Sequence, residues 1–263
     1  MKHAIATLVI AVALTACATT TSSTGRRQYV GAVSQDQLNQ LGAQTFTEAR
    51  RKGPLSSDPR QNAYVRCVVD ALVRQLPAEQ RAIAWESAVF AENEPNAYAL
   101  PGGKVGINTG LFSVARGQDQ LAAVVAHEIG HVIERHHDER ITRQMGAAGV
   151  VQLLGALAGD YGQLATQGGG MLAQTGFLLP GSRAQESEAD VVGQRLMAQA
   201  GFDPRAAVAL WQNMIAAGGS RPPQWLSTHP DPSSRIAELQ ARADKLVPTW
   251  QQARAAGRRP ACG

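Results

Sequence analysis

Two histidines and a glutamate form the strongest candidate for a reactive site in this sequence. His127 and His131 are four positions apart, and Glu128 directly follows the first of them. On a helix, residues at this spacing lie one turn apart on the same face, so both imidazoles can reach one ion at about 2.0–2.1 Å, the usual zinc–nitrogen distance. The pattern predicts a zinc site in which a single helix supplies two ligands.

The helix that carries these residues is expected from Asp119 to about His136. A helical wheel places Glu128 among apolar side chains, namely Leu121, Val124, Val125 and Val132. Burying an ionisable trio costs on the order of several kcal/mol unless the groups are paired or bind a metal. The burial pattern therefore favours metal chemistry over a chance match.

A third zinc ligand is needed because catalytic zinc usually has three protein ligands and keeps its fourth position for water. The candidates are His229 and the acidic cluster at residues 186–190. Within that cluster Glu186 and Asp190 share one helical face, whereas Glu188 points elsewhere. Glu186 as the ligand, with Asp190 steadying an imidazole N–H, is the most economical geometry.

The remaining histidines are assigned more ordinary positions. His136 and His137 lie in the charged run 134–140, which is expected to be a solvated helix end. His229 also has a plain alternative, a loop histidine packed by Pro230.

Several motifs in order resemble the gluzincin metallopeptidase family of the CaaX prenyl endopeptidase and HtpX, and within it the lipoprotein branch of LoiP and BepA. They are Asn96–Gly103, His127–His131, Ser182–Asp190, and Ser227–Pro230 with Arg235. The resemblance spans about residues 60–240. It implies one zinc ion per chain, with Glu186 at the matched ligand position and with Asp190 and Arg235 in support. The chain lacks the spanning helices of the polytopic members.

The chemistry expected of such a site is peptide hydrolysis. Bound zinc acidifies a water, and Glu128 takes its proton during attack on the peptide carbonyl and returns it to the leaving amine. His229 is assigned to the developing oxyanion. In some relatives the matching histidine binds the metal and blocks the water site, so His229 is a stabiliser, a plug, or both in turn.

A small antiparallel sheet is expected beside the active-site helix. Residues 83–91 and 98–108 alternate in polarity, and Pro101-Gly102-Gly103 interrupts the second run as a hairpin turn would. An extended substrate needs an exposed strand edge with which its backbone N–H and C=O groups can form hydrogen bonds. The candidate edge comprises Lys104, Val105, Gly106, Ile107 and Asn108; the alternative is a hairpin that only packs.

The rest of the chain predicts an α+β fold that is mainly helical, with a zincin-like core. Helices are expected at 34–52, 59–76, 182–200, 204–218 and 232–246, from apolar spacing and capping residues. Residues 146–181 are rich in Gly, Ala, Leu and Gln, and no run there is long enough to span a membrane. This region is either a lid over the cleft or a surface that rests on the membrane or a partner.

The composition is that of a globular chain of 263 residues. Hydrophobic residues make up 44% and charged residues 17%, which is enough to bury a sizeable core. Lys and Arg total 25 against 21 Asp and Glu, a mild excess that is spread along the chain. No nucleic-acid partner is expected. One metallopeptidase domain is predicted at 31–250, followed by a solvated tail at 251–263.

The N-terminus resembles a bacterial lipoprotein signal. Residues 1–16, which include His3, form a basic and then apolar segment that ends in Leu-Thr-Ala before Cys17. We expect cleavage before Cys17, lipidation of that cysteine, and a flexible tether over 17–30. In bacterial lipoproteins that are retained at the inner membrane, Asp usually follows the lipidated cysteine. Ala18 occupies that position here, so the periplasmic face of the outer membrane is favoured.

Two cysteines remain, Cys67 and Cys262, and the predicted compartment is oxidising. A disulfide between them is one hypothesis, and one buried thiol with one frayed tail thiol is the other.

Together these patterns predict a zinc endopeptidase of the bacterial periplasm, anchored to the outer membrane by lipid. Its substrates would be unfolded or misassembled envelope proteins, and its partners the outer-membrane assembly machinery. The alternative is a chaperone-like binding lipoprotein with suppressed peptidase activity. A zinc esterase or deacetylase that acts on cell-wall material could use the same kind of zinc site, but no motif here indicates sugar recognition.

Overall fold

The computed structural model describes residues 18–157, 181–218, 225, 229 and 232–263, so the predicted signal and Cys17 lie outside the described residues. The fold is mainly helical with a small sheet, which confirms the predicted class. Two compact units are present. One takes its described residues from 18–38 and 135–157, and the other from 39–134 and 181–263.

The first unit is a hairpin with a helix. Strands β1 (Ala18–Thr21) and β2 (Arg27–Val30) pair antiparallel, and α6 runs from His136 to Leu157. Arg26 donates two hydrogen bonds to the buried carboxylate of Glu139, at 3.0 and 2.8 Å. The backbone N–H of Gly31 donates to Asp138 Oδ1 at 2.9 Å. The charged run at the start of α6 is thus held against the hairpin.

This packing corrects the expectation of a solvated helix end. His136 and His137 are buried, at 0% and 5% exposure. The expected single helix to His136 is also divided, because α5 ends at Ile133 and Arg135 takes a positive φ of 56° before α6 begins. The prediction failed because partners far away in sequence cover these charges. Of region 146–181, α6 accounts for residues up to 157, and residues 158–180 lie outside the described part.

The second unit contains a three-stranded sheet in the order β3-β5-β4. Strand β4 (Ala97–Leu100) pairs antiparallel with β5 (Lys104–Asn108), as the hairpin pattern predicted. Strand β3 (Glu86–Phe90) pairs parallel with β5, so the sheet is mixed rather than wholly antiparallel. The turn between β4 and β5 places positive φ at Gly102 (78°) and Gly103 (72°), which glycine tolerates.

The prediction that Lys104–Asn108 forms the exposed edge is wrong. Strand β5 is the central strand and has neighbours on both sides, because β4 returns along the side of β5 that β3 does not occupy. The outer side of β3 is bonded as well, since Ser56 N–H donates to Val89 O at 2.8 Å and Ala91 N–H donates to Pro54 O at 2.7 Å. Strand β4 is the remaining outer strand of this sheet.

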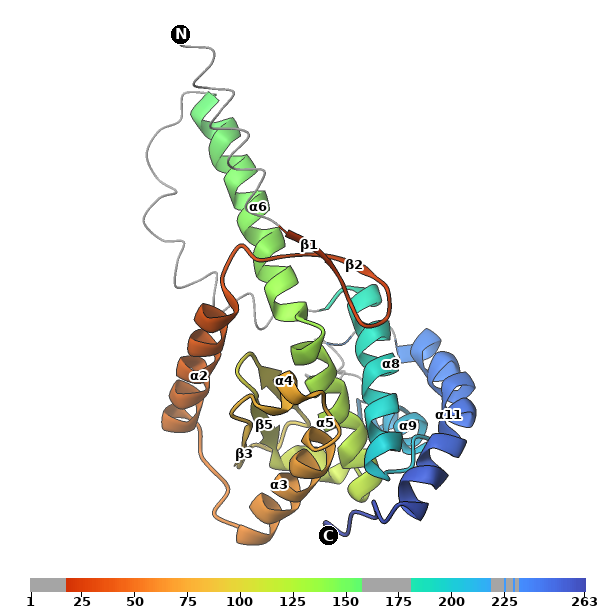
Figure 1. Cartoon of the computed structure of the whole chain (residues 1–263). Helices are drawn as coiled ribbons and strands as arrows, with labels where there is room; N and C mark the ends of the chain where they lie inside the picture. Colours follow the sequence, from red (N-terminus) through yellow and green to blue (C-terminus); the bar gives the residue numbers. More distant parts are fainter. Residues whose placement is uncertain (1–17, 158–180, 219–224, 226–228, 230–231) are drawn as a thin grey trace. The chain divides into compact units, whose positions relative to one another are not determined.

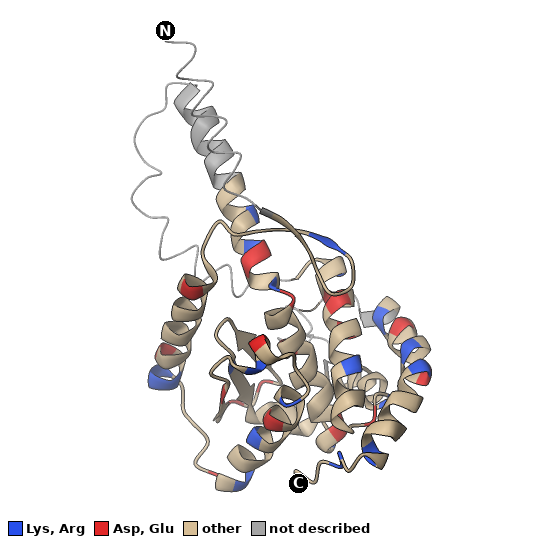
Figure 2. Ribbon diagram, in the orientation of Figure 1, with Lys and Arg blue, Asp and Glu red and all other residues tan. Residues whose placement is uncertain are grey.

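The other elements follow the predicted order (Figure 1). Helix α2 (Gln35–Lys52) crosses the boundary between the units. The described elements of the second unit further include α3 (Pro59–Val73), α4 (Ala78–Arg81), the 3-10 helix η1 (Thr109–Ser113), α5 (Gln118–Ile133), α8 (Arg183–Ala200), α9 (Ala206–Gly218) and α11 (Pro232–Ala255). Apolar side chains of α3, β5, α5, α8 and α9 form one core. Figure 2 shows both signs of charge interspersed along α11.

Helix α8 begins where its capping residues predict. Ser182 accepts from the N–H of Gln185 at 3.3 Å, and Gln185 Oε1 accepts from the N–H of Ser182 at 3.2 Å, which completes a capping box. Gly201 ends the helix in the left-handed conformation. The cap fixes Glu186 in the first turn of α8.

Helices α5 and α8 pack closely because glycines lie at their contact. A Cβ at Gly130 would be 3.0 Å from Ala189 O, and one at Gly193 would be 2.8 Å from His127 N. A larger side chain at either position would push the two backbones apart. The close approach lets side chains on α8 reach the histidines of α5.

The C-terminal segment, 251–263, is mostly exposed but is attached to the second unit. Cys67 and Cys262 form a disulfide, with Cα atoms 5.4 Å apart. Gln118, the first residue of α5, donates to Pro260 O and accepts from the N–H of Cys262, both at 2.9 Å. The pattern of polar residues could not reveal these partners, because they come from elements more than 100 residues away.

No helix among the described residues is long and apolar enough to cross a bilayer.

Replacing Gly193 with Ala tests the α5–α8 contact. The new methyl group would meet the backbone of α5, so we expect the free energy of unfolding to fall by about 1–3 kcal/mol. Gly146→Ala in α6 is the matched control, because nothing lies within 4 Å of its added Cβ. Better helix propensity should raise the stability of this control by up to about 1 kcal/mol. Urea denaturation measures both, and equal stabilisation by the two changes would contradict the close packing.

Candidate metal centre

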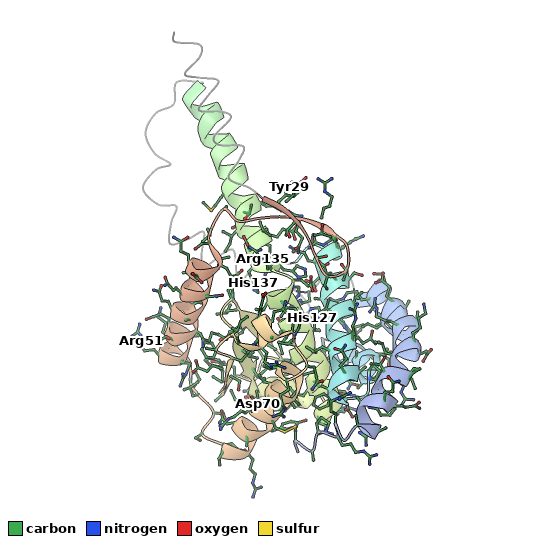
Figure 3. All side chains as sticks on the ribbon, in the orientation of Figure 1. Tyr29, Arg51, Asp70, His127, Arg135 and His137 are labelled. Carbon is green, nitrogen blue, oxygen red and sulfur yellow. A yellow bond between two sulfur atoms is a disulfide. The ribbon has the colours of Figure 1, made fainter. Side chains whose placement is uncertain are left out.

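Four buried side chains bring potential ligand atoms together in the second unit. One ligand atom from each of His127, His131, Glu186 and His229 lies within 4.8 Å of all the others. Helix α5 supplies the first two, the first turn of α8 supplies the third, and His229 precedes α11. Figure 3 labels His127 beside α8. The structure thus gathers both candidates for the third ligand.

The spacing of these atoms fits one metal ion. Ligands bound tetrahedrally at about 2.0–2.1 Å lie roughly 3.3 Å from one another. His127 Nε2 lies 3.1 Å from His131 Nε2, 3.1 Å from His229 Nδ1 and 3.3 Å from Glu186 Oε2. Glu186 Oε1 is buried and has no hydrogen-bond partner, which is costly unless a cation balances it. The nitrogen and carboxylate donors are those that zinc prefers.

A chain of polar contacts orients the site. His127 Nδ1 lies 2.9 Å from Asp190 Oδ1, which leaves Nε2 directed at the cluster. Arg235 donates to both oxygens of Asp190 at 2.7 Å and to Glu186 Oε2 at 3.0 Å. Its guanidinium stacks 4.0 Å from the ring centre of Trp211. Asp190 and Arg235 therefore lie against the cluster, and the supporting role expected of them stays a prediction.

The two carboxylates among these polar contacts, Glu186 and Asp190, favour the ionised form. Burial raises the pKa of Glu186, but the nearby charges of His229 and His131 outweigh it and hold this pKa well below its ordinary value. Burial likewise raises the pKa of Asp190, and the Arg235 guanidinium reverses the effect. Both groups are thus in the charged state that ligation and charge-assisted hydrogen bonding require.

Glu128 lies beside the cluster without belonging to it. Its Oε1 accepts from the indole N–H of Trp225 at 2.9 Å and lies 3.3 Å from His229 Nε2. Burial raises the pKa of Glu128, but the charge and hydrogen bonding of His229, the charge of His127 and the Trp225 hydrogen bond together lower it. A buried, ionised carboxylate next to a metal cluster is suited to accept a proton.

His229 takes the fourth place in the cluster. Its Nδ1 lies 2.8 Å from Glu186 Oε2, so with His127 and His131 it completes a set of four protein donors. Burial lowers the pKa of His229, but Glu186 and Glu128 raise it to about 9. Of the roles left open by the sequence, this arrangement corresponds to the one that occupies the water position.

Trp225 is the site residue that sequence reasoning missed. It is 1% exposed and contacts Glu128, and its ring centre lies 4.8 Å from that of His229. A signal was available, because Trp225 and His229 are four residues apart, the same spacing as His127 and His131. The N–H of His229 donates to Trp225 O at 2.9 Å, so a backbone hydrogen bond joins the two residues directly.

A paired-histidine helix, a glutamate from a later helix and a separate carboxylate beside them define the class of zinc metallopeptidases. A family model for peptidase family M48 matches residues 59–243. The chain belongs to this family, which confirms the resemblance seen in the motifs. The family is zinc-dependent, and the cluster can bind one such ion.

Relatives with curated names extend the comparison. The mitochondrial metalloendopeptidase OMA1 of Schizosaccharomyces pombe is 41% identical over 160 residues, covering 60% of this chain and 46% of its own length. The beta-barrel assembly-enhancing protease of Escherichia coli K12 is 32% identical over 225 residues, covering 82% and 46%. A putative beta-barrel assembly-enhancing protease of Vibrio cholerae is 32% identical over 213 residues, covering 76% and 42%. The chain spans less than half the length of these relatives.

Metal content of two glutamate variants tests the ligand assignment. Glu186→Gln should lose most of the bound zinc, because an amide cannot replace the charged carboxylate of the cluster. Glu188→Gln is the matched control, since Glu188 is buried on the same helix but lies outside the cluster. Elemental analysis of the purified proteins should find zinc near one equivalent in the control. Equal zinc in both variants would exclude Glu186 as a ligand.

Metal-free protein should lose stability as the pH rises from about 6.5 to about 9. The pKa of His229 is higher in the fold than its ordinary value of 6.5, so its stabilising effect is complete below 6.5 and disappears through pH 9. The acidic groups, with lowered pKa values, stay ionised over this range in both states. Denaturation of the apoprotein at several pH values measures the trend, and His229→Asn should make it less steep. Part of the slope should remain, because burial lowers the pKa of His127 but Asp190 and Glu186 outweigh burial and raise it. If the pH dependence of stability in His229→Asn equals that of the wild type, its assignment to His229 is wrong.

Proposed function

We propose that the chain is a zinc-dependent endopeptidase. The observation that carries this proposal is the place of Glu128, whose carboxylate lies beside the four-donor cluster but is not one of its members. A purely structural zinc site has no need of a buried carboxylate at that point. Membership of peptidase family M48 supports the same reaction.

When bound, zinc supplies Lewis acidity, which lowers the pKa of a water toward about 7 and polarises the scissile carbonyl. Glu128 accepts the proton of that water and later gives it to the leaving amine. Asp190 holds the His127 ring in the tautomer that directs Nε2 to the metal, and Arg235 holds Asp190. Each of these groups is buried, so bulk water does not compete for their hydrogen bonds.

His229 has to leave the cluster before the reaction. Four protein donors close a zinc site, whereas hydrolysis needs one open position. We assign the arrangement in this structure to a resting form. Once displaced, His229 remains close to Glu128 and, with a raised pKa, can donate a hydrogen bond to the developing oxyanion.

The outer strand β4 replaces β5 as the proposed substrate-binding edge. Helix α5 contacts β4, so a peptide paired with this strand would pass near the metal cluster. The N–H of Asn108 donates to Asn96 O at 3.0 Å, so these two residues form a hydrogen-bonded pair of the antiparallel ladder. Hydrogen-bonded and non-hydrogen-bonded pairs alternate along such a ladder. The backbone N–H and C=O of Ala99, which is paired with Val105, therefore point away from β5. Main-chain pairing would give the substrate register without demanding a particular sequence.

We further propose that the enzyme is an outer-membrane lipoprotein that faces the periplasm, anchored through Cys17, and acts on unfolded or misassembled envelope proteins. The N-terminal residues support the anchor, and the disulfide between Cys67 and Cys262 suits an oxidising compartment. A relative named as a beta-barrel assembly-enhancing protease supports a link to the outer-membrane assembly machinery.

A chaperone-like lipoprotein with suppressed peptidase activity is the second candidate. The position of His229 favours it, because a permanently closed site would bind zinc and clients without cleaving them. The two functions differ in whether the fourth position ever opens.

Glu128→Gln separates the two candidates. The amide keeps the shape of the side chain but cannot accept the proton, so casein cleavage should fall by roughly 10²–10⁴-fold while bound zinc stays near one equivalent. The wild-type protein and a chelator-treated sample are measured beside it. Cleavage that survives in Glu128→Gln would remove Glu128 from the mechanism, and a zinc-loaded wild type that cleaves nothing would favour the chaperone-like function.

A further inference from the structure

Trp225 makes three contacts inside the metal centre that the peptidase reaction does not by itself require. Its indole N–H donates to Glu128 Oε1 at 2.9 Å, and its ring packs at 4.8 Å from the His229 ring and 5.7 Å from the His127 ring. The side chain is 1% exposed. The tryptophan therefore touches the proposed base and two of the proposed ligands.

The indole is anchored in the core independently of His229. Its ring centre lies 4.7 Å from that of Trp211, and it belongs to the hydrophobic cluster that also includes Met214 and Leu239. A large aromatic side chain packed in this way is strongly held by the core. His229 is less deeply buried, at 7% exposure. Displacing the imidazole from the cluster thus leaves the indole in place.

The hydrogen bond distinguishes the two oxygens of Glu128. Oε1 is engaged by Trp225 and lies near His229, whereas Oε2 has no hydrogen bond to any residue in the described part of the chain. A glutamate side chain has three rotatable bonds, and catalysis needs its carboxylate in one orientation. The donor on Oε1 fixes that orientation and leaves Oε2 to meet the water.

We propose that Trp225 is a positioning residue for Glu128, holding one carboxylate oxygen so that the other accepts the proton in the hydrolytic step. This inference rests on the proposed peptidase function. Trp225 acts through Glu128 and exchanges no proton itself. Its N–H keeps the base in register both when His229 occupies the cluster and when it has left.

Trp225→Phe tests the role of the N–H, because phenylalanine retains an aromatic ring and removes the donor. Loss of one hydrogen bond to a charged group should lower kcat by about ten- to a hundredfold, with KM changed less than about twofold and zinc content unchanged. Trp250→Phe is the matched control. It removes a similar indole bond, from Nε1 to Gly201 O at 3.0 Å, away from the metal centre, and should leave kcat unchanged.

A spectroscopic measurement tests the bond without using activity. In protein labelled with ¹⁵N in its indole groups, the chain's four tryptophans give separate N–H resonances. The Trp225 resonance, identified by its loss in Trp225→Phe, should move in Glu128→Gln, while that of Trp250 stays in place. If Trp225→Phe does not fold, phenylalanine variants of Trp85, Trp211 and Trp250 assign the Trp225 signal by elimination.

The outcomes separate this inference from the proposed function. If Glu128→Gln abolishes cleavage but Trp225→Phe keeps the wild-type kcat, the positioning role is wrong and the peptidase proposal stands. A rise in kcat in Trp225→Phe would also overturn the role, since it would show that Trp225 restrains the base rather than serving it. If the wild type cleaves nothing, the peptidase proposal fails, and an unmoved Trp225 resonance in Glu128→Gln would show that the bond is absent as well.

Discussion

The close contact between α5 and α8 is the constraint on which the metal centre depends. His127 and His131 come from one helix and Glu186 from the other, and the donor atoms meet only because Gly130 and Gly193 allow the backbones to approach. A shift of about 1 Å between the helices would exceed what zinc coordination tolerates. The capping box at the start of α8 adds a second condition, since it sets which residue occupies the first turn.

Buried charge is balanced within this contact by a continuous set of partners. Asp190 would be costly on its own, but Arg235 donates to both of its oxygens and His127 lies against one of them. Arg235 in turn rests on the face of Trp211. Because removal of any one member exposes the charge of the next, the network is suited to hold one rigid arrangement of ligands.

The same rigidity limits which ligand can move when the site opens. Three of the four donors lie on α5 and α8 and cannot separate without unpacking the core, whereas His229 lies on a segment between α9 and α11. The opening proposed for the site is therefore assigned to His229. Trp225, four residues before it, is buried in the core and contacts both His229 and the proposed base, Glu128.

Features that depend on local spacing could be predicted from the sequence. The pair His127 and His131, the cap at Ser182 and the face shared by Glu186 and Asp190 all follow from helical periodicity, and the structure places them together. Strand order, in contrast, was decided by the fold. Alternation in 104–108 indicates a strand but cannot say which neighbours it will have, so β5 was wrongly taken for an edge.

Three features arise from long-range packing and could not be predicted from local patterns. They are the burial of His136 and His137, the attachment of the C-terminal segment through Gln118, and the contact of Trp225 with Glu128. Their partners lie 97 residues or more away in the last two cases. A polar run looks solvated until another part of the chain covers it, because hydrogen bonds over such distances leave no periodic trace. The residues that form the site could therefore be predicted from the sequence, but the partners that bury and surround them could not.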